Sequence, residues 1–151
     1  MVICFKKLDP AAIIPTFAND DSSNAGLDFY APHPVSIQPH GYTIVDTLVA
    51  WDGGRIHYDG APVRKVLIIK SRSGLAFNSG VEASNSGVVD SSFTRSIKIK
   101  LYNNSDNPVY CNTGSRIAQG IIYELPNVYV KEVSDIPESS RGSSGFGSSG
   151  K

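Results

Sequence analysis

The chain has 151 residues, enough for one domain with a buried core. Hydrophobic residues make up 40% of it and charged residues 19%, a balance that favours a globular body over a disordered chain. With 14 acidic and 14 basic residues the formal net charge is zero, which argues against a protein that coats nucleic acid through its phosphates. A small anionic ligand held by a few arginine and lysine side chains is compatible with this balance.

The sequence shows neither a secretion signal nor a membrane span. The apolar run at residues 2–5 is too short for a signal peptide, and no apolar stretch approaches the length that crosses a bilayer. Cys4 and Cys111 have neither metal-ligand spacing nor a Cys-x-x-Cys pattern, so we interpret both as buried thiols of a reducing compartment. We therefore expect a protein that is not secreted and does not bind membranes. The expected location is the cytoplasm, or the nucleus or host cytoplasm for a eukaryotic or viral source.

The hydrophobic pattern along the chain is that of short strands. Five segments carry it, in chain order residues 42–45, 66–69, 96–102, 120–123 and 128–130. The second is a continuous apolar run, as expected of a strand buried on both faces. In the third, Ile97, Ile99 and Leu101 alternate with two lysines and a tyrosine, which predicts one buried and one exposed face. Residues 74–77 begin a short helix at most.

Turn residues separate these strands, and many short strands at close spacing predict an all-β fold, either a sandwich, a jelly roll or a small barrel. From about Pro137 the composition shifts to serine and glycine. The sequence therefore predicts a β-domain over residues 1–138 and a flexible arm over residues 139–151.

The arm has the composition of a linker but carries two side chains that a linker does not need. Arg141 offers a fixed fork of donors that suits phosphate, and Phe146 offers an apolar face that can stack on a base. The glycines and serines around them supply backbone N–H groups and hydroxyls that can wrap around an anion. This pattern predicts an arm that folds over a nucleotide.

Four segments of the body carry further candidate site residues. Asp28 begins a strand among apolar residues, where it either caps a turn or belongs to a site. Residues 70–76 leave a buried strand with Arg72, two hydroxyls and several N–H groups that can face phosphate oxygens. Asp90 follows an apolar pair and is either a turn aspartate or a general base that activates water. Gln119 lies among apolar residues where a turn enters a strand.

Together and in this order, the five segments closely resemble the motifs of the homotrimeric dUTPase (dUTP diphosphatase) family. The matching stretches are Ala-Gly-Leu-Asp at 25–28, Ser-Arg-Ser-Gly-Leu-Ala at 71–76, Gly-Val-Val-Asp-Ser-Ser-Phe at 87–93, Gly-Ser-Arg-Ile-Ala-Gln at 114–119 and Arg-Gly-Ser-Ser-Gly-Phe-Gly-Ser at 141–148. The resemblance implies a distorted jelly-roll, β-barrel-like subunit with a flexible Gly/Ser-rich arm. It also implies a homotrimer in which three subunits share three active sites.

The resemblance further implies a reaction and roles for the site residues. Asp90 would be the base that activates a water for attack on the α-phosphorus of dUTP, releasing dUMP and pyrophosphate. Ser73 would stabilise charge on the leaving group. Asp28 and Gln119 would orient waters on a Mg²⁺ ion held mainly by the substrate phosphates. The implied substrate contacts come from Arg72, Ser73, Gly74, Ser84, Asn85, Gly87, Phe93, Gln119, Arg141, Phe146, Gly147 and Ser148.

Recognition of the base and the sugar follows from the same resemblance. The hairpin with Ser84, Asn85 and Gly87 would bind the uracil edge and exclude the methyl group of thymine, with either Ser84 or Asn85 in the place of the family's asparagine. Phe93 would pack against the deoxyribose and leave no room for a 2′-hydroxyl. The arm would close the site with Phe146 over the uracil. Such an enzyme keeps uracil out of DNA and supplies dUMP for thymidylate synthesis.

The sequence departs from the family pattern at two places. The third motif usually continues with an acidic residue, a tyrosine and, two residues on, a glycine, whereas this chain has Ser92, Phe93 and Arg95. The loop over residues 52–64 is longer than the usual connection and is interpreted as an extended surface hairpin. Two alternatives stay open: a deoxycytidine triphosphate deaminase of similar fold, and a dUTP-binding regulatory module with reduced catalysis.

Overall fold

The chain is built from short antiparallel strands. The computed structural model describes residues 3–20, 23–53, 64–83 and 87–138. In chain order the elements of these residues are β1 (Cys4–Lys7), the 3-10 turn η1 (Ala18–Asp20), β2 (Leu27–Tyr30), β3 (Val35–Ile37), β4 (Tyr42–Asp46), β5 (Val49–Asp52), β6 (Arg64–Lys70), α1 (Ser73–Ser79), β7 (Val81–Ala83), β8 (Val88–Asp90), β9 (Lys98–Asn103), β10 (Val109–Cys111) and β11 (Arg116–Leu125).

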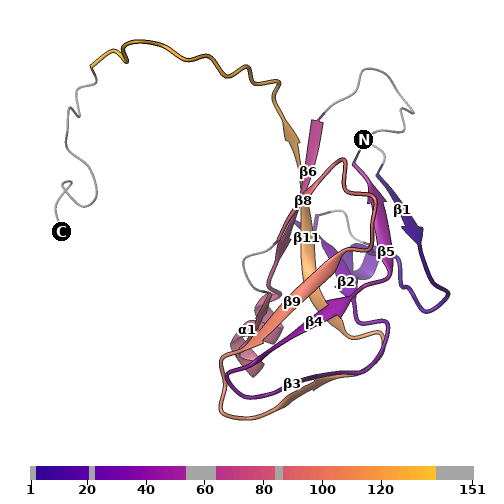
Figure 1. Cartoon of the computed structure of the whole chain (residues 1–151). Coiled ribbons are helices and arrows are strands. Elements are labelled where there is room, and N and C mark those ends of the chain that lie inside the picture. Colours follow the sequence, from indigo (N-terminus) through magenta and orange to yellow (C-terminus); the bar gives the residue numbers. More distant parts are fainter. Residues whose placement is uncertain (1–2, 21–22, 54–63, 84–86, 139–151) are drawn as a thin grey trace.

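The strands β6 and β11 lie at the centre of the fold (Figure 1). They belong to a four-stranded sheet of order β2-β11-β6-β8, which lies beside a three-stranded sheet of order β4-β9-β7. The pairs β1-β5 and β10-β3 complete the sheets of the described residues, and the ladders among them are antiparallel. The predicted all-β class is confirmed, although these strands form separate sheets and do not close into one barrel.

One hydrophobic core joins the sheets and follows the predicted patterns. Ile97, Ile99 and Leu101 are at most 2% exposed, while Lys98 between them faces solvent. This confirms the alternation predicted for residues 96–102. β6 pairs with β11 on one side and β8 on the other, and its residue Leu67 is fully buried. The continuous apolar run at residues 66–69 is therefore a central strand, as its sequence predicts.

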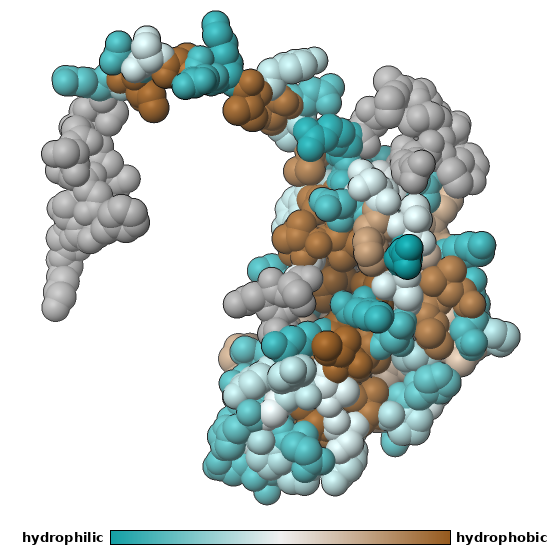
Figure 2. Space-filling model, viewed as in Figure 1, coloured by the Kyte–Doolittle hydropathy of each residue, from teal (hydrophilic) through white to brown (hydrophobic). Residues whose placement is uncertain are grey.

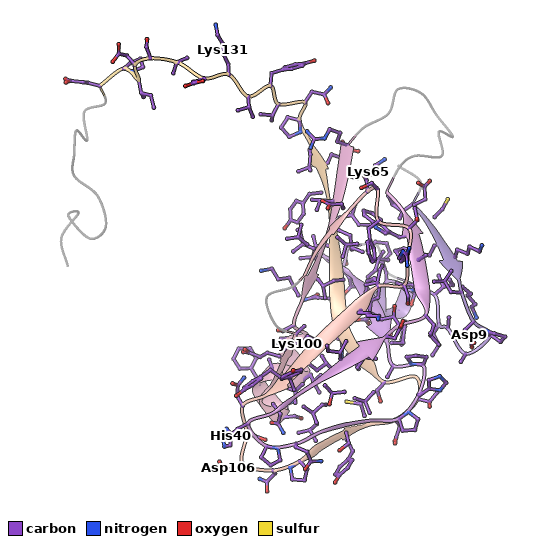
Figure 3. All side chains as sticks on the ribbon, in the orientation of Figure 1. Asp9, His40, Lys65, Lys100, Asp106 and Lys131 are labelled. Atoms are coloured by element: carbon purple, nitrogen blue, oxygen red, sulfur yellow. The ribbon has the colours of Figure 1, made fainter. Side chains whose placement is uncertain are left out.

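The strand predicted at residues 128–130 is wrong. Val128, Tyr129 and Val130 belong to no strand and are 65%, 92% and 97% exposed. The segment 126–138 instead leaves the end of β11 and runs away from the sheets (Figure 1), with Lys131 along it (Figure 3). Figure 2 shows hydrophobic and hydrophilic groups side by side along it. β-branched and aromatic residues favour a strand, but a strand also needs a neighbour, and no described strand of this chain pairs with the segment.

α1 is the short helix that the sequence predicts near Gly74. It has 7 residues, buries none of them, and ends at Gly80 in the left-handed conformation, with φ of 68°. No helix within the described ranges is long and apolar enough to cross a membrane. The predicted boundary of the β-domain at residue 138 stays a prediction, because the arm at residues 139–151 lies outside the described residues.

Candidate active site

Three polar residues form one row across the central sheet. Asp28 on β2 and Lys70 at the end of β6 both lie opposite Gln119 of β11, one on each side. Directly opposed residues of antiparallel strands point to the same face, so the three side chains share one face of the sheet. The next residue of β11, Gly120, is buried, because it turns toward the core. The row places Asp28 and Gln119 beside the connection that follows β6.

The carboxylate of Asp28 is enclosed and held by two arginines. Its side chain is 7% exposed. Nε of Arg72 donates to Oδ1 over 2.7 Å, and Nη1 of Arg116 donates to Oδ2 over 3.4 Å. A buried carboxylate requires such partners, because its charge loses the stabilisation by water. Of the two interpretations that the sequence left open for Asp28, this geometry favours the site over the turn cap.

Arg116 is a further candidate site residue, which the sequence analysis did not predict. A β-bulge between Arg116 and Ala118 lets Arg116 pair with Tyr30 while Ala118 pairs with Phe29. In a regular strand, residues two apart share one face. Here the bulge turns Arg116 toward the face of Asp28, while Ala118 is buried in the core. The sequence signal was only an arginine within the Gly-Ser-Arg-Ile-Ala-Gln stretch.

The residues that follow β6 present donors suited to an anion. The carbonyl of Arg72 accepts the N–H of Ala76 over 3.0 Å and so begins α1. Because Nε of Arg72 is bound to Asp28, its two terminal nitrogens, which have no partner among the described residues, are available to a ligand. Ser73 and Gly74 are exposed in the first turn of α1, where backbone N–H groups lack intrahelical acceptors. The predicted grouping of Arg72, Ser73 and Gly74 is therefore present.

Gln119 connects the row to the same segment. Its Nε2 donates to the carbonyl of Ser71 over 2.9 Å, which leaves Oε1 as an acceptor. The hydroxyl of Ser71 is fixed in turn by the N–H of Ala83, over 3.0 Å. Within the described residues no group of three or more His, Cys, Asp or Glu could hold a metal ion. Asp28 is already paired to two arginines and is not free to bind a cation directly. The arrangement therefore suits a metal ion held through phosphate oxygens and water better than one held by protein ligands alone.

Asp90 and Phe93 lie at one pocket of about 800 Å³. The Phe93 N–H donates to the Asp90 carbonyl over 3.0 Å, closing a turn after β8. The carboxylate is exposed and the ring is 41% exposed. Apolar side chains of the lining are Ile44, Val88, Val89, Phe93 and Ile97, and charged ones are Asp46, Asp90, Arg95, Lys98 and Lys100. A pocket of this size that combines apolar walls with the exposed carboxylate of Asp90 is typical of a small-molecule site.

Gly87 lies beside this pocket at a position where no larger residue fits. Its carbonyl accepts the N–H of Ile69 over 2.7 Å, and a methyl group on Gly87 would overlap the carbonyl oxygen of Ile69. The backbone of the hairpin that begins β8 therefore lies directly against β6. Other predicted substrate contacts lie outside the described residues and stay predictions: Ser84, Asn85, Arg141, Phe146, Gly147 and Ser148.

The two groups of site residues lie apart within one chain. On β6, Val66 lies opposite Asp90, whereas Lys70 lies opposite Gln119. These two positions on β6 are about 13 Å apart, at roughly 3.3 Å per residue. The residues suited to phosphate and the pocket with Asp90 therefore lie at different points along the same strand.

Hydrogen-bond donors suited to phosphate, together with a pocket that holds an accessible carboxylate, fit a nucleotide hydrolase. The dUTPase family model matches residues 12–150. The deoxyuridine 5′-triphosphate nucleotidohydrolase of Helicobacter pylori (strain ATCC 700392 / 26695) is 36% identical over 151 residues, which cover 99% of this chain and 97% of that protein. A protein of the same name from Picosynechococcus sp. is 34% identical over 145 residues, 95% of each chain.

Solved structures show the same fold. The dUTPase of Staphylococcus bacteriophage 80alpha with dUPNHPP aligns with a TM-score of 0.84 at 22% identity, covering 99% of both chains. A mutant dUTPase from phage phi11 of S. aureus, in which the coordination of a structural Mg(II) ion was revealed, aligns with a TM-score of 0.74 at 19% identity, covering 89% of this chain and 98% of that one.

This chain belongs to the dUTPase family. The family match and the named relatives confirm the resemblance stated from the sequence and the prediction that the chain is an enzyme, a dUTP diphosphatase. The likeness to the phage structures confirms the predicted jelly-roll-like fold.

Proposed function

We propose that this chain hydrolyses dUTP to dUMP and pyrophosphate. The relatives named deoxyuridine 5′-triphosphate nucleotidohydrolases support the substrate. The observation that carries the mechanism is the turn that places the Asp90 carboxylate and the Phe93 ring at one pocket. In a cytoplasmic setting this activity keeps uracil out of DNA and supplies dUMP for thymidylate synthesis.

Asp90 is the general base of this reaction. Its carboxylate takes a proton from a water molecule whose oxygen bonds to the α-phosphorus. The bond between that phosphorus and the oxygen bridging to the β-phosphate breaks, and pyrophosphate leaves with the bridging oxygen. Assistance of this kind contributes roughly 10²–10⁴-fold to a rate. Closure of the arm over the pocket would exclude bulk water and strengthen the electrostatic interactions inside it.

The nucleoside is selected at the same pocket. Phe93 packs against the deoxyribose, so a 2′-hydroxyl meets the ring. Gly87 holds the hairpin strand against β6, and from there the backbone near Ser84 and Asn85 reads the uracil edge. Phe93 lacks the hydroxyl of the tyrosine that the family usually has at this position. The packing on the sugar does not depend on that hydroxyl, because the flat face of the ring makes the contact.

Arg72 and Ser73 hold the phosphates on the other side of the site. Asp28 fixes the guanidinium of Arg72 through Nε, so its terminal nitrogens are oriented before substrate arrives, which lowers the cost of ordering them. A Mg²⁺ ion held through the phosphates would neutralise part of the charge of the triphosphate and would fix its conformation. Asp28 and Oε1 of Gln119 would accept hydrogen bonds from waters on such an ion.

A complete site forms where subunits of a homotrimer meet. Two observations support this proposal. Within one chain, the pocket with Asp90 and the residues suited to phosphate adjoin positions on β6 that are about 13 Å apart. The segment 126–138 carries exposed apolar side chains that a neighbouring subunit can cover, namely Val128, Tyr129, Val130, Val133 and Ile136. The arm at residues 139–151 then closes the site with Arg141 and Phe146.

Pyrophosphate release from dUTP, dTTP, dCTP and UTP, with and without Mg²⁺, tests the reaction. We expect Mg²⁺-assisted hydrolysis of dUTP alone, lost in an Asp90→Asn variant that keeps the size of the side chain but not its basicity. Ammonia release from dCTP would identify a deaminase instead. Tight dUTP binding without turnover would identify a regulatory binding module.

Mixed trimers test the shared site. Asp90→Asn and Arg72→Met variants are each expected to be inactive alone. If each site takes Asp90 and Arg72 from different subunits, refolding the two variants together restores about a quarter of the wild-type activity, the share of sites that receive both intact residues in random closed trimers. Activity that stays absent from the mixture, while the variants do form mixed trimers, would contradict a shared site.

A further inference from the structure

The strand β5 holds both ends of the segment that carries Asp90 and Phe93. The indole Nε1 of Trp51 donates to the carbonyl of Asp90 over 3.2 Å. At the other end, the N–H of Ile97 donates to the carbonyl of Val49 over 2.9 Å. β5 pairs with β1, while Asp90 ends the edge strand β8 of the four-stranded sheet. These two hydrogen bonds therefore tie the turn after β8 to a strand of another sheet.

Trp51 is itself immobilised. It is 2% exposed and belongs to the hydrophobic core, and it lies opposite Phe5 of β1. A buried indole N–H needs an acceptor, and here that acceptor is the carbonyl of the proposed general base. The same carbonyl accepts the N–H of Phe93 over 3.0 Å. One oxygen atom thus links the core, the base and the ring that faces the sugar.

Gly53 adds a steric restraint next to this bond. It follows β5 and is buried. A methyl group on Gly53 would overlap Cα and Cβ of Ser91, the residue after Asp90. The backbone of β5 therefore lies directly against the turn, with no room for a side chain. Trp51 restrains the carbonyl of Asp90, and Gly53 restrains the residue that follows it.

We propose that Trp51 and Gly53 are positioning residues for hydrolysis. They fix the backbone of Asp90 and Ser91, so that the Asp90 carboxylate keeps its direction toward the attacking water. This inference rests on the proposed function of Asp90. Neither residue lines the pocket, so we expect their loss to change the geometry of the base more than nucleotide binding. Displacement of a catalytic group by about 1 Å costs up to roughly 100-fold in rate.

The direct test compares Trp51→Phe with wild type at 25 °C. Phenylalanine keeps an aromatic ring in the core but lacks the N–H donor. We expect kcat for dUTP to fall about fivefold, the worth of one hydrogen bond of this kind, with KM and the affinity for a non-hydrolysable dUTP analogue within about twofold of wild type. In Gly53→Ala the added methyl group displaces the backbone of Ser91. We expect this to move Asp90 further than Trp51→Phe does and to lower kcat at least tenfold.

Thr43→Val is the matched control. It also removes a side-chain donor to a backbone carbonyl, the 2.7 Å bond from Oγ1 of Thr43 to Ser36, and it is isosteric. It is expected to lower the melting temperature but to leave kcat unchanged. The proposal is overturned if Trp51→Phe keeps kcat within twofold of wild type, or if Thr43→Val lowers kcat as much. If wild type releases no pyrophosphate, or if Asp90→Asn releases it at an undiminished rate, the proposed function fails and this inference falls with it.

Discussion

Arg72 and Arg116 both bind the Asp28 carboxylate, and we expect the two to stabilise it unequally. At the observed 2.7 and 3.4 Å, Coulomb attraction at an effective dielectric constant of about 20 is about 6 kcal/mol for Arg72 and about 5 kcal/mol for Arg116. The side chain of Arg72 is 25% exposed and that of Arg116 is 46% exposed, so solvent screens the second pair more. After desolvation we expect a coupling energy of about 3 kcal/mol for Asp28 with Arg72. For Asp28 with Arg116 we expect at most about 1 kcal/mol.

Double-mutant cycles that combine Asp28→Asn with Arg72→Met or Arg116→Met measure both coupling energies. The free energy of unfolding is taken from urea denaturation at one fixed protein concentration, because subunit association contributes to it. His40 and Asp106, which lie next to each other in Figure 3, supply the control, since they form a 2.9 Å pair with side chains 62% and 93% exposed. The reasoning is refuted if Arg116 couples to Asp28 as strongly as Arg72 does, or if neither exceeds the control pair.

Three further predictions concern the pocket, the hairpin and Cys111. Phe93→Ala should reduce the preference for dUTP over UTP by about tenfold, whereas Phe93→Tyr should keep it. The ratio of kcat/KM for the two nucleotides measures this preference, and an unchanged ratio in Phe93→Ala would contradict the sugar contact. Gly87→Ala should raise KM for dUTP about tenfold, because the added methyl group displaces the backbone at Gly87 from Ile69. Gly41→Ala is the control and should leave KM unchanged; a wild-type KM in Gly87→Ala would contradict the role of Gly87. Burial raises the pKa of the Cys111 thiol above its usual 9.0. Just above pH 9.0 the thiol therefore keeps its proton in the native chain but loses it in the unfolded chain. The free energy of unfolding should therefore fall as the pH rises above 9.0, and Cys111→Ala should lack this fall in urea denaturation, whereas equal slopes in the two proteins would contradict it.

The sequence was informative where chemistry and local pattern coincide. The alternation around Ile99 predicts β9 because one face of that strand meets the core and the other meets water. Asp28, Arg72, Asp90 and Gln119 could be identified because each is a polar residue placed where an apolar strand begins, ends or turns. Their order along the chain then carried the resemblance to the family.

The remaining features depend on contacts between distant parts of the chain. The bulge that turns Arg116 toward Asp28 has no signature in hydrophobic periodicity. The bond from Trp51 to Asp90 joins residues 39 positions apart in two different sheets. The strand predicted at residues 128–130 failed for a related reason, because local propensity favours an extended backbone but cannot supply the neighbouring strand that it needs.

Hydrolysis of dUTP in water enriched in oxygen-18 is the most direct test of the proposed reaction. If a water activated by Asp90 attacks the α-phosphorus, one heavy oxygen appears in dUMP and none in pyrophosphate, and an Asp90→Asn variant forms the same labelled dUMP at a rate lower by roughly 10²–10⁴-fold. Mass spectrometry of the two products reads the position of the label. Heavy oxygen in pyrophosphate, or an undiminished rate in Asp90→Asn, would contradict the account.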